Sequence, residues 1–346
     1  MSDAIAHRGP DGQGLWLSHD SQINPDQPQV AFAHRRLAII DPDPRANQPF
    51  TDGQSHWLIY NGEIYNYRQL RQELQQLDPG YQWKTQCDTE VLLRAYARWG
   101  PACVDRFNGM FAFAIWDAHR QQLLLARDRM GQKPLYLMQA PGSQAIAFAS
   151  ELGALRALDW FDPAISQAGL AQYLAVGYTL PPATICSAVE QLRPAEVVQA
   201  SAHGLSRTTY FDPNPDPGEP IPDDQAAIET RRLILHAVSS RLVADVPLGC
   251  FLSGGVDSSI VAAAMREAAG TGRAVHTFTI GFDDPRYDET QYAEAVARHL
   301  ETRHERFTVT PRAADDLPRL ARVFGEPFAD SSALPTHYLS RQTRQF

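Results

Sequence analysis

The chain has 346 residues, enough for two domains that each bury a core. Hydrophobic residues make up 44% of the sequence and the formal net charge is −9, which is typical of a soluble, mildly acidic protein. The absence of a basic patch argues against nucleic acid as the main ligand. No apolar run reaches the roughly 20 residues of a membrane span, and the first residues do not form a signal peptide. The cysteines are scattered and lack a Cys-x-x-Cys motif, which favours reduced thiols in the cytoplasm over a structural zinc site: Cys87, Cys103, Cys186 and Cys250.

The first half predicts strands in quick succession with a few helices. A strand-like run over 30–40, interrupted at His34-Arg-Arg36, and a short strand over 57–60 precede two helices, over 67–78 and 88–100. Further strands are predicted over 110–116, 122–127, 135–138 and 145–149. No element is expected before the motif that begins at His7. This spacing predicts two antiparallel sheets packed between helices.

The second half begins after a proline-rich stretch. Five prolines between Phe211 and Asp224 exclude a helix or a central strand there, so we interpret 211–224 as an interdomain linker. Strands are then predicted over 246–252, 275–282 and 305–309, and helices over 228–242, 260–269, 288–300 and 315–324. Strands alternating with helices predict a parallel, doubly wound sheet that binds ligands at the carboxyl ends of its strands.

One loop at such an end is suited to phosphate. Ser253-Gly-Gly-Val-Asp-Ser258 joins a predicted buried strand to a helix, and free N–H groups at a helix start favour anions. The glycine pair lets the backbone approach a phosphate, and Asp257 could hold Mg²⁺. The loop lacks Gly-Lys-Ser/Thr and is not the usual P-loop. The simpler alternative is a turn into a core helix that Ser258 and Ser259 cap.

Several motifs follow one another in a single order along the chain. They are His7-Arg-Gly-Pro-Asp11, Arg36-Leu-Ala-Ile-Ile-Asp41, Asn61-Gly-Glu-Ile-Tyr-Asn66, Asp88-Thr-Glu90, Gly109-Met-Phe-Ala-Phe113, Ala126-Arg-Asp-Arg129, Lys133-Pro-Leu-Tyr136, Ser150-Glu151 and the serine-glycine loop. Together they resemble the glutamine-hydrolysing asparagine synthetases from Met1 to Phe346. The resemblance implies an N-terminal class II glutamine amidotransferase domain over 1–210 and the N-terminal part of an ATP-pyrophosphatase synthetase domain over 225–346.

The resemblance also implies the folds and the reaction. The expected folds are an Ntn-hydrolase-type αββα sandwich that lacks its first strand, followed by an incomplete doubly wound parallel sheet. The expected substrates are glutamine, aspartate and ATP, with Mg²⁺ as cofactor and a cytoplasmic location. Ammonia from glutamine would attack β-aspartyl-AMP. A homodimer is compatible with the resemblance.

Residue by residue, the resemblance implies two binding sites. Arg36 matches the residue that holds the glutamine carboxylate, Asp88 the acceptor of its ammonium, and Glu63 a further contact. Asn61, through its side-chain amide, and Gly62, through its N–H, match the oxyanion hole. The residues that match the ATP site are Leu252, Ser253, Gly254, Gly255, Asp257, Ser258 and Ile280. Glu326 and Asp330 match a stretch near the aspartate site.

Several residues of the first half also have a purely local interpretation. Asp88 could be the N-cap of the helix that it starts, and Asn61-Gly62 is a common turn pair. Arg36, next to Arg35, could be a solvated charge. His7 and His34 are single histidines, better interpreted as local hydrogen-bonding groups than as catalysts.

The sequence departs from the family at both ends. The family's N-terminal cysteine nucleophile and the strand that it heads have no counterpart here. Ser2 stands only four residues before His7, too few for a strand and a helix, and Cys87 has no free α-amine. The family's later Ser-Gly-Glu-Gly-Ala-Asp-Glu loop also has no counterpart. We therefore expect no glutamine hydrolysis and negligible asparagine synthesis by this chain.

Two other functions stay open. One is a β-lactam-synthetase-like adenylating enzyme with an inactive glutaminase. The other is a non-catalytic fragment or subunit partner. The GMP and NAD synthetases share the serine-glycine loop but not the motifs of the first half.

Overall fold

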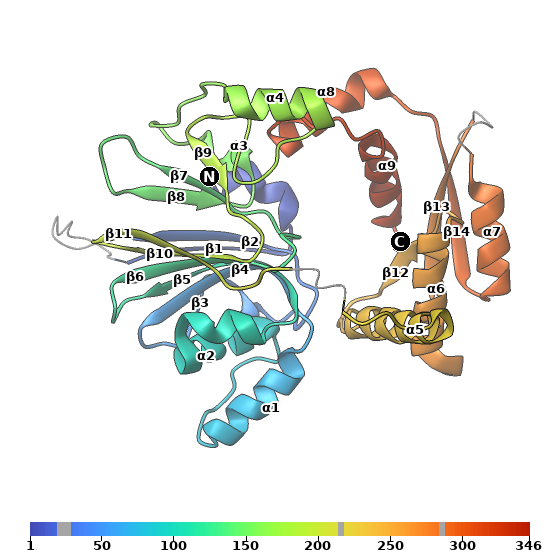
Figure 1. Cartoon of the computed structure of the whole chain (residues 1–346), viewed down its shortest axis with the longest axis horizontal. Coiled ribbons are helices and arrows are strands. Elements are labelled where there is room, and N and C mark those ends of the chain that lie inside the picture. Colours follow the sequence, from blue (N-terminus) through green and yellow to red (C-terminus); the bar gives the residue numbers. More distant parts are fainter. Residues whose placement is uncertain (19–28, 214–217, 284–287) are drawn as a thin grey trace. The chain divides into compact units, whose positions relative to one another are not determined.

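The computed structural model describes residues 1–18, 29–213, 218–283 and 288–346 (Figure 1). It divides into two compact units, Met1–Asn214 with Ala321–Ala329, and Pro215–Leu320 with Asp330–Phe346. Residues 214–217 of the predicted linker lie outside the described residues. Within the described residues, no helix combines the length and apolar character that crossing a membrane requires.

An antiparallel sheet forms the centre of the first unit. Its strand order is β11-β10-β6-β5-β4-β3. The strands are β3 (Phe50–Thr51), β4 (His56–Ile64), β5 (Gly109–Asp117), β6 (Gln122–Arg127), β10 (Glu196–Ser201) and β11 (Gly204–Thr209). Helices α1 (Tyr67–Leu77) and α2 (Asp88–Trp99) lie on its outer side (Figure 1).

A second layer of strands faces this sheet. It consists of β1 (Gly12–Leu17) paired with β2 (Ala31–Arg36), and of β7 (Tyr136–Gln139) between β8 (Ile146–Ala149) and β9 (Val189–Gln191). Phe32, Leu125, Leu137 and Val198 join the two layers in one buried core. The remaining elements are η1 (Asp3–Arg8), η2 (Pro44–Ala46), η3 (Gly100–Arg106), α3 (Leu152–Leu155) and α4 (Gln167–Val176). Helices outside two facing sheets confirm the predicted αββα sandwich.

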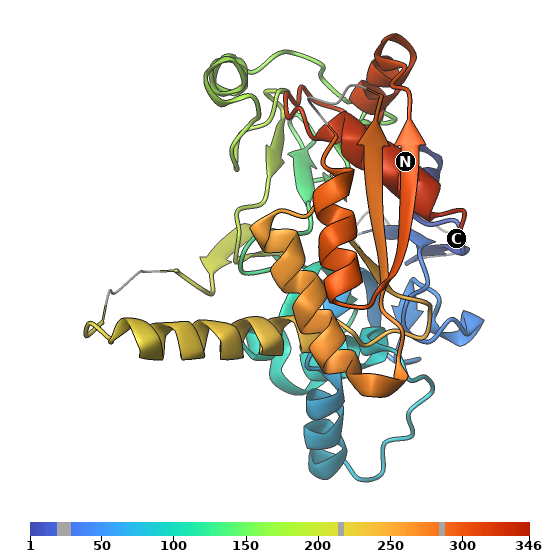
Figure 2. The same cartoon turned by 90° about the vertical axis from the view of Figure 1, so that its right-hand side faces the viewer.

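The second unit contains a parallel sheet in the order β12-β13-β14. Its strands are β12 (Gly249–Phe251), β13 (His276–Phe282) and β14 (Arg303–Val309). Its helices are α5 (Asp223–Ser240), α6 (Val256–Ala269), η4 (Gly270–Gly272), α7 (Thr290–His299) and α9 (Ala333–Thr343). Helix α8 (Ala313–Phe324) belongs to this unit up to Leu320 and to the first unit from Ala321. Helices α7 and α9 cover opposite faces of β13 and β14 (Figure 2). This arrangement confirms the predicted parallel, doubly wound sheet.

Two predictions about the strands of the first unit are wrong. β4 continues through Asn61 and Gly62, where the residue pair alone predicts a turn, and β2 continues through His34-Arg-Arg36. Asn61 pairs with Ala112 and Gly62 with Phe111, so the ladder with β5 runs on to Ile64. Pairing across the sheet therefore overrides the local turn preference.

Two predictions about the serine-glycine loop are also wrong. The strand expected over 246–252 has only three residues and is not buried, since Phe251 is 44% exposed. β12 lies at an edge and, among the described strands, pairs only with β13. Gly255 is the N-cap of α6, and the hydroxyls of Ser258 and Ser259 donate to its carbonyl at 3.2 and 2.7 Å. These two serines lie inside the first turn rather than before it.

Candidate functional site

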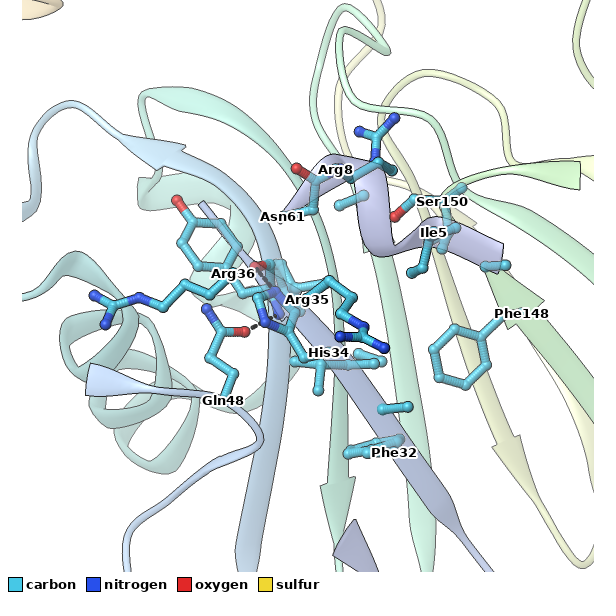
Figure 3. A pocket seen from close by; sticks show the side chains of 18 of the residues that line it. Ile5, Arg8, Phe32, His34, Arg35, Arg36, Gln48, Asn61, Phe148 and Ser150 are labelled. Carbon is cyan, nitrogen blue, oxygen red and sulfur yellow. Dashed lines mark hydrogen bonds between the residues drawn. The ribbon is translucent and has the colours of Figure 1, made fainter. Parts of the chain in front are cut away.

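A cavity of about 680 Å³ lies in the first unit between β2, β4 and β8. The five residues predicted to bind glutamine all line it: Arg36, Asn61, Gly62, Glu63 and Asp88. They come from the end of β2, from β4 and from the first residue of α2. Arg36 and Arg35 point to opposite sides of β2, as successive residues of a strand do, and Phe148 faces the cavity from β8 (Figure 3). The structure thus brings together residues from three motifs that are far apart in the sequence.

Asn61 presents an amide that lacks a partner. Its Nδ2 atom is buried and has no hydrogen-bond partner within the described structure. A buried donor without a partner costs about 1–3 kcal/mol, and such atoms are rare in native proteins. Gly62, next in the strand, has no space for a side chain, because a Cβ there would collide with the Met110 carbonyl oxygen. The glycine lets β4 and β5 approach closely beside this free amide.

Asp88 is a buried carboxylate without a cation. It is 4% exposed, and its Oδ2 accepts hydrogen bonds from Tyr60 Oη at 2.8 Å and Ile64 N at 3.0 Å. Burial raises the pKa of Asp88, and no described lysine or arginine forms an ion pair with it. The N-cap of α2 is Cys87, so Asp88 is not the cap but the first residue of the helix. An acceptor with this setting is suited to a positively charged ligand group.

Arg36 is not the solvated charge of the local interpretation. Its side chain is buried, and both terminal nitrogens are already in use. Nη1 donates to Asp43 O and Asn47 Oδ1, both at 3.0 Å, and Nη2 donates to Ile40 O at 3.2 Å and Asp41 O at 2.6 Å. The loop over 40–47 therefore fixes the guanidinium. A bidentate grip on a carboxylate would require one of these contacts to be exchanged.

Three cavity residues were not predicted as site residues. The imidazole Nε2 of His34 lies 3.1 Å from Tyr60 O, while its Nδ1 is buried without a partner in the described structure. Gln48 Oε1 accepts from Tyr60 N at 2.6 Å, and burial lowers the pKa of Lys133. The local interpretation of His34 explains its Nε2 contact but not its free Nδ1. No sequence signal could have shown this free atom, since it depends on strand packing.

Two candidate nucleophiles line the cavity in unsuitable settings. Burial, with the charge of Asp88, raises the pKa of Cys87 to about 12, so its thiol stays protonated at neutral pH. Ser2, the N-cap of η1, accepts a hydrogen bond at Oγ from Arg35 Nε at 3.1 Å, and no described carboxylate or imidazole is hydrogen-bonded to this oxygen. Cys87 Sγ donates to Asp88 Oδ1 at 3.2 Å, but the charge of Asp88 raises the pKa of the thiol and so disfavours the thiolate that would act as the nucleophile.

The second unit holds the serine-glycine loop at the carboxyl end of β12. Gly254 has φ +83°, and a Cβ on it would lie 2.5 Å from Tyr292 Cβ and 2.6 Å from Ala293 N. Only glycine fits there. Ser253 Oγ and Ser258 Oγ lie 3.0 Å apart across the loop, and Gly255 begins α6. An exposed turn before a long helix is suited to hold phosphate groups.

The other predicted nucleotide residues lie around this loop. Leu252 is buried, and its N–H donates to Phe278 O at 2.8 Å, while Ile280 lies two residues further along β13. Both residues thus stand toward the carboxyl ends of adjacent parallel strands. Asp257 is exposed in the first turn of α6. Among the described side chains, no group of three His, Cys, Asp or Glu is placed to hold a metal ion.

Glu326 and Asp330 fall in different units. Glu326 belongs to the first unit, where Tyr136 Oη donates to Oε1 at 2.8 Å and Thr179 Oγ1 donates to Oε2 at 3.0 Å. The Ile185 N–H also donates to Oε2, at 3.3 Å. Asp330 is exposed and accepts hydrogen bonds from its neighbour Ser332. The structure gives Glu326 an anchoring role and does not place the two acids in one site.

Comparison with known proteins connects both regions to described families. Residues 1–211 match a family model described as glutamine amidotransferase domain, and residues 229–346 match one described as asparagine synthase. Asparagine synthetase (glutamine-hydrolyzing) 1 of Bacillus subtilis is 33% identical over 348 residues, covering 100% of this chain and 52% of that protein. A putative asparagine synthetase (glutamine-hydrolyzing) 2 of Methanocaldococcus jannaschii is 33% identical over 367 residues, covering 100% of this chain and 68% of that protein.

Two further similarities are weaker. Asparagine synthetase B of Escherichia coli is 30% identical, covering 92% of this chain and 52% of that protein. The chain thus spans about half the length of the Bacillus and Escherichia relatives. One solved structure is the glutamine phosphoribosylpyrophosphate amidotransferase from B. subtilis complexed with ADP and GMP. The alignment with it covers 91% of this chain and 66% of the amidotransferase chain. Its TM-score is 0.40 at 17% identity.

Proposed function

The chain belongs to the family of glutamine-hydrolysing asparagine synthetases, and from this premise we propose that its first unit binds glutamine and its second unit binds ATP. The complete reaction would be a carbon–nitrogen ligation. The side-chain carboxylate of aspartate attacks the α-phosphate of ATP and releases pyrophosphate, and ammonia derived from glutamine then displaces AMP from the resulting β-aspartyl-AMP to give asparagine. The chain spans only about half the length of the Bacillus and Escherichia relatives. For this chain we therefore propose the two binding steps, and we propose the complete reaction only for full-length members of the family.

In the proposed glutamine complex, each end of the ligand meets a complementary group. Asp88 accepts from the ammonium, and Glu63 adds a polar contact. Arg36 donates to the carboxylate after exchanging one of its contacts to the loop over 40–47. The amide oxygen lies against Asn61 Nδ2 and the Gly62 N–H, which would also stabilise an oxyanion. The observation that supports this arrangement best is that Asp88 lacks a cation and Asn61 lacks an acceptor within one cavity.

We propose that this chain holds glutamine without hydrolysing it. Cys87 keeps its proton, and Ser2 lacks a base, so neither is positioned to attack the amide. Glutamate release from glutamine by the purified chain measures this directly. Turnover above a protein-free control would contradict the proposal, and loss of that turnover in Ser2→Ala or Cys87→Ala would identify the nucleophile.

In the proposed nucleotide complex, the loop Ser253–Ser258 surrounds the phosphates. The backbone near Gly254 and Gly255 and the serine hydroxyls donate to phosphate oxygens, while Leu252 and Ile280 contact the nucleotide. A Mg²⁺ ion in proteins often takes one or two carboxylates together with substrate phosphates, and the single carboxylate of Asp257 fits that pattern. When bound, the ion would neutralise phosphate charge.

Calorimetry tests both binding proposals. Titration with glutamine should give saturable binding that Asp88→Asn weakens, and titration with ATP should give binding that is tighter with Mg²⁺ than with EDTA. Absence of glutamine binding with ATP binding intact would favour the β-lactam-synthetase-like alternative. Absence of both would favour a non-catalytic fragment or subunit partner.

We also propose a cytoplasmic location. Cys87, Cys103, Cys186 and Cys250 are all free thiols, which agrees with a reducing compartment. A homodimer stays a prediction, which sedimentation of the purified chain would check.

A further inference from the structure

Two polar atoms in the glutamine cavity are buried without a partner in the described structure. They are Nδ1 of His34 and Nδ2 of Asn61, and both residues line the cavity. The proposed function assigns a role to the Asn61 amide but leaves the imidazole nitrogen without one. Since buried polar atoms in native proteins are almost always paired, a ligand that pairs one of them should pair the other.

The contact to Tyr60 determines which hydrogen the imidazole carries. Nε2 of His34 lies 3.1 Å from the Tyr60 carbonyl oxygen, and a carbonyl oxygen can only accept. Nε2 therefore carries the hydrogen. Burial lowers the pKa of His34 to about 4, so the ring is neutral at physiological pH. The remaining nitrogen, Nδ1, is then a hydrogen-bond acceptor.

The backbone of β4 connects this acceptor to the Asn61 donor. The carbonyl that anchors His34 belongs to the peptide group joining Tyr60 to Asn61. The preceding peptide is also fixed, because Tyr60 N donates to Gln48 Oε1 at 2.6 Å. Figure 3 shows His34 near Gln48, and Asn61 further along the cavity toward Arg8. The site thus offers one fixed acceptor and one fixed donor.

One acceptor and one donor that line the same cavity are complementary to a primary carboxamide. The carboxamide has a C=O that accepts and an NH₂ that donates, whereas a carboxylate only accepts. We propose that His34 Nδ1 accepts a hydrogen bond from the NH₂ of the glutamine side chain while Asn61 Nδ2 donates to its oxygen. His34 is then the residue by which the site distinguishes glutamine from glutamate, whose second oxygen would face the imidazole lone pair. This inference rests on the proposed function of the same site.

Two substitutions separate the pocket acceptor from the anchor to Tyr60. In His34→Asn, the amide reaches the position of Nδ1, so its oxygen can replace the acceptor while the anchor is lost. In His34→Gln, the longer amide reaches the position of Nε2, so its NH₂ can keep the anchor while the acceptor is lost. If His34 serves folding alone, His34→Gln should resemble the unmodified chain more closely. If His34 recognises the ligand, His34→Asn should keep the preference for glutamine better than His34→Gln.

The experiment is calorimetric titration of the full chain and its variants with glutamine and with glutamate. We expect the unmodified chain and His34→Asn to bind glutamine at least about tenfold more tightly than glutamate. We expect His34→Gln to bind glutamine several-fold more weakly and to bring the ratio of the two affinities close to one. His7→Gln, which changes a histidine outside the cavity, should leave the ratio unchanged. Thermal unfolding of each variant confirms that it is folded.

The outcomes separate this inference from the proposed function. If the unmodified chain prefers glutamine and His34→Gln keeps that preference, the role of His34 is refuted while the glutamine site stands. If the unmodified chain binds neither amino acid, both proposals are refuted. If His34→Asn loses the preference as fully as His34→Gln, an acceptor at the Nδ1 position does not give the preference, and this inference is refuted.

Discussion

Replacing Asp88 by asparagine separates ligand binding from folding. Its Oδ2 accepts from Tyr60 Oη and Ile64 N, and Oδ1 accepts from Cys87 Sγ. In Asp88→Asn, the amide oxygen can occupy the Oδ2 position and the NH₂ can face the sulfur. The local hydrogen bonds therefore have counterparts in the variant.

The charge has opposite effects on stability and on binding. Burial raises the pKa of Asp88 above its unfolded value, so its stabilising contribution is present at low pH and is lost as pH rises through the folded pKa. An uncharged asparagine should therefore leave the free energy of unfolding at neutral pH unchanged or raise it. A hydrogen bond between charged groups contributes about 1.5–3 kcal/mol. Loss of that bond to the glutamine ammonium should raise Kd about 10- to 150-fold.

Calorimetry with glutamine and urea unfolding measure both effects on the same preparations. Asp78→Asn is a matched control, because Asp78 is a half-exposed carboxylate at the far end of α1. It should leave Kd unchanged. The reasoning is refuted if Asp88→Asn keeps its affinity for glutamine within about twofold, or if it lowers the free energy of unfolding by more than about 2 kcal/mol.

Three further predictions concern other parts of the chain. Gly254→Ala should lower the free energy of unfolding by about 2–4 kcal/mol in urea titrations, because φ is +83° and the new Cβ meets α7; Gly255→Ala, with φ −69°, should be milder. Glu326→Ala should cost about 2–3 kcal/mol, because three donors lose their acceptor, whereas Glu326→Gln keeps most of these bonds and should cost less than half as much in the same assay. Stability should also depend on pH through Asp52 and His56, because His56 Nδ1 lies 2.6 Å from Asp52 Oδ2. Burial by itself would raise the pKa of Asp52, but hydrogen bonds, first among them the one from His56, lower this pKa to about 2. The contribution of Asp52 to stability is therefore present above about pH 4 and is lost as pH falls toward 2. The pKa of His56 is raised by Asp52 despite burial, so its contribution is present below about pH 6.5 and is lost as pH rises through the higher folded value. Melting temperatures across pH should show both losses, and a profile that His56→Asn leaves unchanged would contradict the pairing.

Hydrophobic periodicity was sufficient to predict the bounds of the helices and strands with strong patterns. The strand predicted over 122–127 is β6, and the helices predicted from Tyr67 and from Asp88 begin at those residues. Elements without such a pattern were missed. Helix α4 is apolar around most of its circumference, so no face stands out, and β11 is polar and largely exposed. β11 is held by its pairing with β10, whereas α4 is largely exposed, with Gly169 as its buried residue, and shows no amphipathic face to predict it from.

The site divides in a similar way. The motifs named Arg36, Asn61 and Asp88, and the structure places all three around one cavity. Sequence reasoning could not show that four donors of Arg36 are already used, or that His34 keeps a free acceptor. These properties come from loops and strands that meet only in the folded chain.

The position of Glu326 has a consequence for dividing the protein into fragments. Its carboxylate serves donors on Tyr136 and Thr179, which precede it by 190 and 147 residues. An expression product ending near residue 214 would leave those hydroxyls and the Ile185 N–H to be satisfied by water. An excised first unit that keeps these hydrogen bonds would therefore need the peptide 321–329, supplied separately or joined to it. Adding that peptide to the shortened product and recording the rise in melting temperature would measure how much the carboxylate contributes.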